Sequence, residues 1–490
     1  MSSGILRRAF LGAAAVGAGS LGALAAGEKP AAEPGPAAPV APGRAKVRIG
    51  KVYAGKARPG WPMASVDVAA EQKRFEEQLA RLGPALADIE FIDCGLVMSE
   101  QEIAQAKEQL KDADGILLLQ LTMGISGVIK SLADLGIPVV LFSEPYCGHE
   151  WHIIASLQKQ GKRIDCWASS RFEDIPAAIR PIRAIRRLKD AKVLHVSQRP
   201  ADPKYVEAMK AKFGTQIKSL GLPELEEAYK AVPAAAAAED AEQWIRNAEK
   251  IVEPKKEEIV KASRMALALK NLVDADAADA ITINCLGMGL IDRDMAYPCL
   301  GFARLNSIGL GGICEADLKS TMTHLVFNFL VGKPGFVTDP CFDYATSTIL
   351  HAHCVAATHM DGPGTPGQPY FIRSHLEDNR GVVLQVKLRT GVRVSMARLI
   401  GDDIMLFSTG EAVDSPLVDR GCRTKLAVRV ENPERFLENW SCGLHRVIFY
   451  GDHTRDIQRF CRFMNLRLLR EGIDDLREVP GLEWNPSVHA

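Results

Sequence analysis

The sequence predicts an α/β protein with two doubly wound parallel-sheet α/β domains, followed by a β-rich, antiparallel barrel-like C-terminal domain. Strand-like runs alternate with helical stretches from residue 46 to about residue 345, a pattern typical of parallel sheets between helices. After that point short alternating strands follow one another across Gly or Asp turns, as in an antiparallel meander. A chain of 490 residues also has room for about three domains.

The N-terminal residues 1–27 are similar to a twin-arginine export signal, because Arg7 and Arg8 precede Phe-Leu and a weakly apolar Ala/Gly stretch. The alternative is an N-terminal membrane anchor, but the stretch is too rich in Gly and Ala for a good span. Residues 28–45 are rich in Pro and Ala and predict an extended linker. We therefore expect an exported protein, periplasmic or otherwise extracytoplasmic, with no stable membrane span after signal cleavage.

The first α/β domain is expected over residues 46–180. Its clearest signal is GILLLQL, a continuous apolar run that suits a strand covered on both faces. The strands expected here are 47–53, 88–94, 115–121 and 138–142, and the helices are 66–82 and 99–112.

The second α/β domain is expected over residues 181–345 and the β-rich domain over residues 346–490. Strands at 191–197 and 279–285 and a long charged helical stretch at 239–273 belong to the second. In the last domain we expect strands at 381–388, 391–399, 403–408 and 424–430, and a final helix at 456–471.

Composition excludes several classes of function. Lys+Arg and Asp+Glu are 60 each, so there is no basic excess for nucleic acid or anionic lipid. The eleven cysteines are irregularly spaced and form no CxxC pair, which argues against a disulfide framework or a zinc ribbon. They indicate folding in a reducing compartment.

Four side chains are the candidates for chemistry. Glu315 follows a glycine-rich turn and precedes an apolar helix, where the helix dipole favours an ionised carboxylate. Asp339 follows a short strand, and acids at strand ends line ligand crevices in open α/β sheets. His353 and His445 lie farther along the chain. Locally, Glu315 could serve only as a helix charge, Asp339 as a turn cap, and either histidine as a packed side chain.

Taken in order, these residues resemble the L-fucose isomerase and L-arabinose isomerase superfamily. The resemblance is carried by CEADL (314–318), GKPGFVTD (332–339), AHC (352–354) and GLHR (443–446). It implies a divalent ion, commonly Mn²⁺, held by Glu315, Asp339 and His445. His353 matches a further metal ligand of the arabinose branch. Glu315 and Asp339 would also carry protons as an aldose and a ketose interconvert through a cis-enediol.

The resemblance further implies a homo-oligomer, a trimer or hexamer, in which the first domain of a neighbour completes each active site. The corresponding stretch contains His149, Glu150 and Trp151, and we expect these residues to contact the sugar. Its histidines depart from the family register, so the identity of the sugar stays open. Two alternatives remain: an exported non-catalytic carbohydrate-binding protein, and a related metal-dependent sugar epimerase or dehydratase.

Overall fold

The computed structural model describes residues 45–440, 443–480 and 482. The predicted export signal at 1–27 lies outside these residues, as does the predicted linker apart from its last residue. Within the described part of the chain, no helix combines the length and the apolar character needed to cross a membrane.

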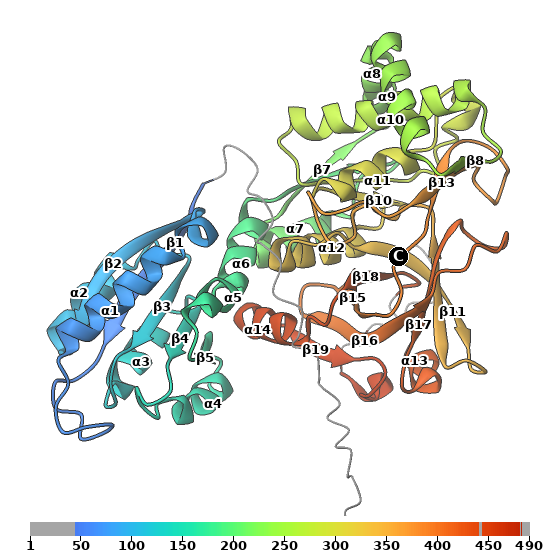
Figure 1. Ribbon diagram of the computed structural model, residues 1–490. Coiled ribbons are helices and arrows are strands. Elements are labelled where there is room, and N and C mark those ends of the chain that lie inside the picture. The colour runs from blue at the N-terminus through green and yellow to red at the C-terminus, as the bar shows by residue number, and fades with distance from the viewer. Residues whose placement is uncertain (1–44, 441–442, 481, 483–490) are drawn as a thin grey trace, which may run out of the picture. The chain divides into compact units, whose positions relative to one another are not determined.

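The first part of the chain folds as a five-stranded parallel sheet in the order β2-β1-β3-β4-β5 (Figure 1). Its elements are β1 (Val47–Ala54), α1 (Val68–Arg81), β2 (Ile89–Val97), α2 (Glu100–Gln109), β3 (Gly115–Gln120), α3 (Ser126–Ala133), β4 (Val139–Ser143), α4 (Trp151–Lys159), β5 (Ile164–Ala168), α5 (Ile175–Ala178) and α6 (Arg180–Asp190). Leu117 and Leu119 pack with α1, α5 and α6, whereas Ile116 and Leu118 pack with α2, α3 and α4. Helices therefore cover both faces, as the apolar run predicted.

A second parallel sheet has four strands in the order β10-β9-β6-β7. The elements of this part are β6 (Lys192–Val196), α7 (Pro203–Phe213), β7 (Gln216–Leu220), α8 (Leu222–Ala231), α9 (Ala234–Asn247), β8 (Lys250–Ile251), α10 (Lys256–Ala275), β9 (Ala280–Ile283), α11 (Cys299–Ser307), β10 (Gly311–Cys314) and α12 (Leu318–Val331). The single long helix expected at 239–273 is wrong. Extended backbone at Ala248 ends α9, and α10 begins only after Pro254, whose ring cannot continue a helix.

The C-terminal region contains a closed six-stranded antiparallel barrel, which confirms the barrel-like prediction (Figure 1). Its strands are β11 (Phe336–Asp343), β12 (Thr348–His353), β15 (Val392–Ile400), β16 (Ile404–Asp414), β17 (Thr424–Arg429) and β18 (Arg446–Tyr450). The order β15-β18-β11-β12-β17-β16 closes because β16 pairs again with β15. Closure leaves these six strands without a free edge.

Four departures from the expected elements occur in this region. The expected strand at 381–388 becomes β14 (Val383–Val386) and lies outside the barrel, in a small sheet with β13 (Tyr370–Arg373) and β8. The first barrel strand, β11, precedes residue 346. The final helix is shorter than expected: α14 (Thr454–Met464) ends where Asn465 adopts a left-handed conformation, and β19 (Arg467–Arg470) follows. A further helix, α13 (Pro433–Asn439), precedes β18.

Helix α12 joins the second sheet to the barrel. Its Leu325 and Phe327 share one hydrophobic cluster with Ile313 of β10 and with Val447 and Phe449 of β18. The rings of Phe327 and Phe449 stack with their centroids 4.2 Å apart. This packing fixes the N-terminal end of α12, where the candidate site begins.

Candidate metal centre

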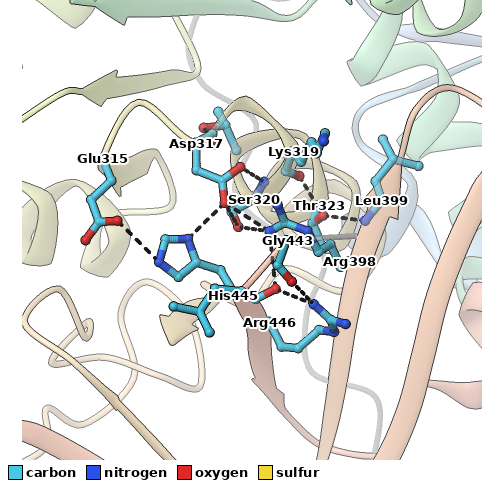
Figure 2. Close-up of polar contacts among 12 residues, drawn as sticks. Glu315, Asp317, Lys319, Ser320, Thr323, Arg398, Leu399, Gly443, His445 and Arg446 are labelled. Carbon is cyan, nitrogen blue, oxygen red and sulfur yellow. Dashed lines mark hydrogen bonds and ion pairs between the residues drawn. The ribbon is translucent and has the colours of Figure 1, made fainter. Parts of the chain in front are cut away.

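His445 lies close to both of the predicted carboxylate ligands. The Nε2 atom of His445 lies 3.2 Å from Oδ1 of Asp339 and 3.5 Å from Oε2 of Glu315. These residues come from the turn before α12, from β11 and from the segment that leads into β18. Figure 2 shows the Glu315 carboxylate facing one end of the His445 imidazole. The imidazole is buried, with 2% of its side chain exposed.

Glu315 lies in a tight turn rather than in the helix. Its φ is +62° and that of Ala316 is +54°, and left-handed backbone at non-glycine residues costs of the order of 1 kcal/mol each. Helix α12 is capped instead by Asp317, whose carboxylate accepts a hydrogen bond of 3.0 Å from the Ser320 N–H. Asp317, and not Glu315, is therefore the cap of α12. The turn directs the Glu315 carboxylate toward His445.

Asp339 lies within a strand, not at the end of one. It pairs with Ala352 in the antiparallel ladder of β11 and β12. The expectation that it ends a strand of an open parallel sheet is therefore wrong. The ladder nevertheless brings it beside His445, because β11 pairs with β18 through residues 336–338.

Asp317 orients the imidazole of His445. The Nδ1–H of His445 donates to Oδ2 of Asp317 over 2.9 Å, so Nε2 faces Glu315 (Figure 2) and lies 3.2 Å from Oδ1 of Asp339. Burial disfavours the charged ring, but the hydrogen bonds to Asp317 and Asp339 outweigh it and raise the pKa of His445 to about 10. Without a cation, the ring is therefore an imidazolium that links the two carboxylates.

Asp317 is itself held in a buried network. Its Oδ2 accepts hydrogen bonds from Arg398 Nη1 at 2.9 Å and from Ser320 Oγ at 2.7 Å. Burial raises the pKa of this carboxyl, but the Arg398 guanidinium and His445 outweigh burial and hold it well below its usual range. The sequence analysis identified neither Asp317 nor Arg398 as part of the site. The position of Asp317 before an apolar helix is a cap signal, but its partners lie 81 and 128 residues away.

His353 lies beside the other three but is held differently. Ligand atoms of Asp339, His353 and His445 all lie within 4.8 Å of one another. The Nδ1 atom of His353 accepts a hydrogen bond of 2.9 Å from the Cys354 N–H, and burial lowers the pKa of the ring. The neutral ring therefore carries its proton on Nε2, which has no hydrogen-bond partner among the described residues. This arrangement favours an N–H donor at the site.

A cavity of about 1040 Å³ opens beside the cluster. Glu315, Asp317 and His445 line one side, and polar side chains that follow β6 and β9, including Ser197 and Asn284, line another. Such a space is large enough for a small polar ligand. The carboxylates and the imidazole thus face a volume that a sugar could enter.

The predicted sugar contacts lie around another pocket. His149 and Trp151 line a pocket of about 580 Å³ with Trp61, whose ring centroid lies 4.1 Å from that of His149. The Glu150 carboxylate is buried and accepts hydrogen bonds from the backbone N–H groups of Gly124 and Ile125. That carboxylate holds the turn after β3. The two pockets share no lining residue.

Comparison of the sequence with protein-family models and with curated proteins gives no match.

Proposed function

We propose that the protein is a divalent-metal-dependent enzyme that interconverts an aldose and a ketose, as in the L-fucose and L-arabinose isomerase superfamily. One observation carries the proposal: the Glu315 and Asp339 carboxylates, which come from distant parts of the chain, both lie within 3.5 Å of the buried Nε2 atom of His445, and Glu315 and His445 line a cavity. A protein that only bound sugar would have no need of this set.

The donor set fits a hard divalent cation. Two carboxylates and one imidazole are ligands that suit Mn²⁺. Nε2 of His445 is buried without a well-directed hydrogen bond although both carboxylates lie within 3.5 Å. Asp317 holds the opposite nitrogen, as carboxylates commonly do for metal-binding histidines. Glu315, Asp339 and His445 would hold the ion.

The reaction needs a proton to move between C1 and C2 of the sugar. A bound divalent ion would supply a Lewis acid that lowers the cost of the negative charge developing on the sugar oxygens. The Glu315 carboxylate lines the cavity and the Asp339 carboxylate lies 3.2 Å from Nε2 of His445; we propose that one accepts the proton at one carbon and the other returns it at the next. Nε2–H of His353 could donate a hydrogen bond to a sugar oxygen. Arg398 and Asp317 keep His445 in its tautomer.

The finer organisation is proposed with the activity. We infer two doubly wound α/β domains at 46–180 and 181–345 and a β-rich domain at 346–490. The strands of the first sheet fall within 47–168 and those of the second within 192–314, which supports the division. We also propose that the protein is a homo-oligomer in which the His149 pocket of one subunit completes the cavity of another. Export by the N-terminal segment is part of the same proposal.

The test begins with metal content. The purified protein is stripped with a chelator, reloaded with Mn²⁺ and analysed by elemental mass spectrometry, beside Glu315→Gln and the control Glu77→Gln, an exposed glutamate of α1. We expect about one ion per chain in wild type and Glu77→Gln and its loss in Glu315→Gln. A metal-free wild type, or a Glu315→Gln variant that keeps its ion, would overturn the proposed site.

A panel of sugars in D₂O then tests the chemistry. An isomerase of this kind incorporates deuterium from solvent at the carbon that receives the proton, and only in the metal-loaded protein. Sugar binding without metal and without exchange would indicate the binding protein instead. A dehydratase would be recognised by a product that has lost water.

A further inference from the structure

Two buried thiols lie in contact next to the candidate metal centre. The Sγ atoms of Cys285 and Cys314 are 2.9 Å apart. Their exposed fractions are 3% and 4%. The proposed isomerisation makes no use of either thiol.

The strands of the second sheet position this pair. Cys314 is the last residue of β10, and Cys285 lies two residues after the end of β9, its parallel neighbour. The Cys285 N–H donates to the Ile283 carbonyl over 2.8 Å, and the Ala316 N–H donates to the same carbonyl over 3.0 Å. Both segments are thereby tied to the end of β9 with their sulfurs facing each other.

We propose that Cys285 and Cys314 form a reversible disulfide that controls the metal site. The sulfurs must approach by less than about 1 Å to reach the bonding distance of about 2.05 Å. Cys285 belongs to a turn, and the next residue, Leu286, is exposed. This turn and the turn at Glu315 and Ala316, directly after Cys314, can share the movement. In contrast, Cys461 is a buried thiol for which no sulfur contact is recorded among the described residues.

The effect on the site follows from position, and this step rests on the proposed function. Cys314 is bonded directly to Glu315, whose left-handed backbone directs its carboxylate to His445. The Cys314 sulfur, a Glu315 oxygen and a His353 nitrogen also lie within 4.8 Å of one another. Drawing Cys314 toward Cys285 therefore shifts a proposed ligand and removes a sulfur from the edge of the cluster. The oxidised protein should hold its ion more weakly.

A small disulfide, such as glutathione disulfide, is the oxidant. The cavity is lined by Asn284 and Leu286, which flank Cys285, and by Glu315 and Ala316, which follow Cys314, so a small molecule in the cavity lies next to the residues that flank both cysteines. One cysteine sulfur attacks the small disulfide and releases one small thiol, and the second cysteine then displaces the other. Two electrons pass from the cysteine sulfurs to the small disulfide, and the two protons leave on the two released thiols.

The test equilibrates the full chain with graded ratios of reduced and oxidised glutathione, traps free thiols by alkylation and maps the peptides by mass spectrometry. We expect one linked peptide pair, Cys285 with Cys314, in wild type and in the control Cys461→Ala. Neither Cys285→Ala nor Cys285→Ser should form it. A protein that keeps both thiols free across the series, or that links Cys314 to another cysteine, overturns the proposal.

Mn²⁺ binding measured on the same samples tests the control of the site. We expect the affinity to fall about 10- to 100-fold on oxidation of wild type, the range for losing a group that supports a ligand, and to stay constant in Cys285→Ala. An unchanged affinity in the linked protein overturns the control. If neither redox state binds Mn²⁺, both the proposed function and the proposed redox control of the metal site fail. Peptide mapping still decides whether the disulfide forms.

Discussion

Replacing Asp317 by Asn removes one charge and leaves the shape of the side chain almost unchanged. Asn caps helices about as well as Asp, so the start of α12 should be retained. What is lost is the anion that partners Arg398, which is 1% exposed, and that holds the His445 ring. Breaking a buried ion pair by removing one partner costs about 3–5 kcal/mol. We expect Asp317→Asn to lower the free energy of unfolding by about 3 kcal/mol, because the amide oxygen can still accept one bond.

Chemical denaturation of chelator-treated protein, followed by circular dichroism, measures this loss. The matched control is Asp67→Asn, the exposed cap of α1, which accepts a bond of 3.0 Å from Ala70 N–H and has no buried partner charge. That variant should change stability by less than about 0.5 kcal/mol. Mn²⁺ affinity should fall about 10- to 100-fold in Asp317→Asn alone. If the two variants prove equally stable and bind Mn²⁺ equally well, the network around Asp317 does not hold the site.

Three further outcomes follow from the same geometry. Asp339→Asn should lower Mn²⁺ affinity more than about 100-fold, which exceeds the loss expected for a group that only supports a ligand. If calorimetric titration finds a smaller loss, Asp339 is not a metal ligand. His353→Phe should keep Mn²⁺ but lower turnover about 10²-fold through loss of the Nε2–H donor, whereas a loss of metal instead would make His353 a ligand. Because the pKa of His445 is raised to about 10 from 6.5, its contribution to metal-free stability is complete below about pH 6.5 and is lost as the pH rises through about 10. Mn²⁺ affinity should rise over the same interval, since each ion displaces the Nε2 proton; denaturation and binding series across that range check both trends, and a pH-independent affinity would contradict the ligand role of His445.

The sequence predicted the features that depend on local pattern. The apolar run at 115–121 could only be a strand covered on both faces, and the alternating strands near the C-terminus form much of the barrel. Pro254 was the local signal that a single helix could not span 239–273. Helix α14 was predicted too long because a left-handed Asn465 is not encoded by periodicity.

The candidate site was predicted less completely, and the reason is distance along the chain. The Glu315 and Asp339 carboxylates both lie close to His445, but the expectation of an ion shared among them came from resemblance and not from spacing. Asp317 could be recognised as a helix cap, but the local sequence does not predict that its carboxylate bonds to Arg398 and His445. The tautomer of His353 depends on a single backbone contact to Cys354. Such features arise only when the second sheet and the barrel pack on α12.

The cluster draws Glu315 from the second parallel sheet and Asp339 and His445 from the barrel. An ion bound there would fasten two substructures that are also joined by apolar packing, part of it on α12. Its occupancy would then be coupled by mass action to barrel closure, adding about 2.7 kcal/mol at an ion concentration of 100 times Kd. Loss of the ion would therefore lower the stability of the folded chain. A shortage of metal would shorten the lifetime of the protein and also abolish its activity.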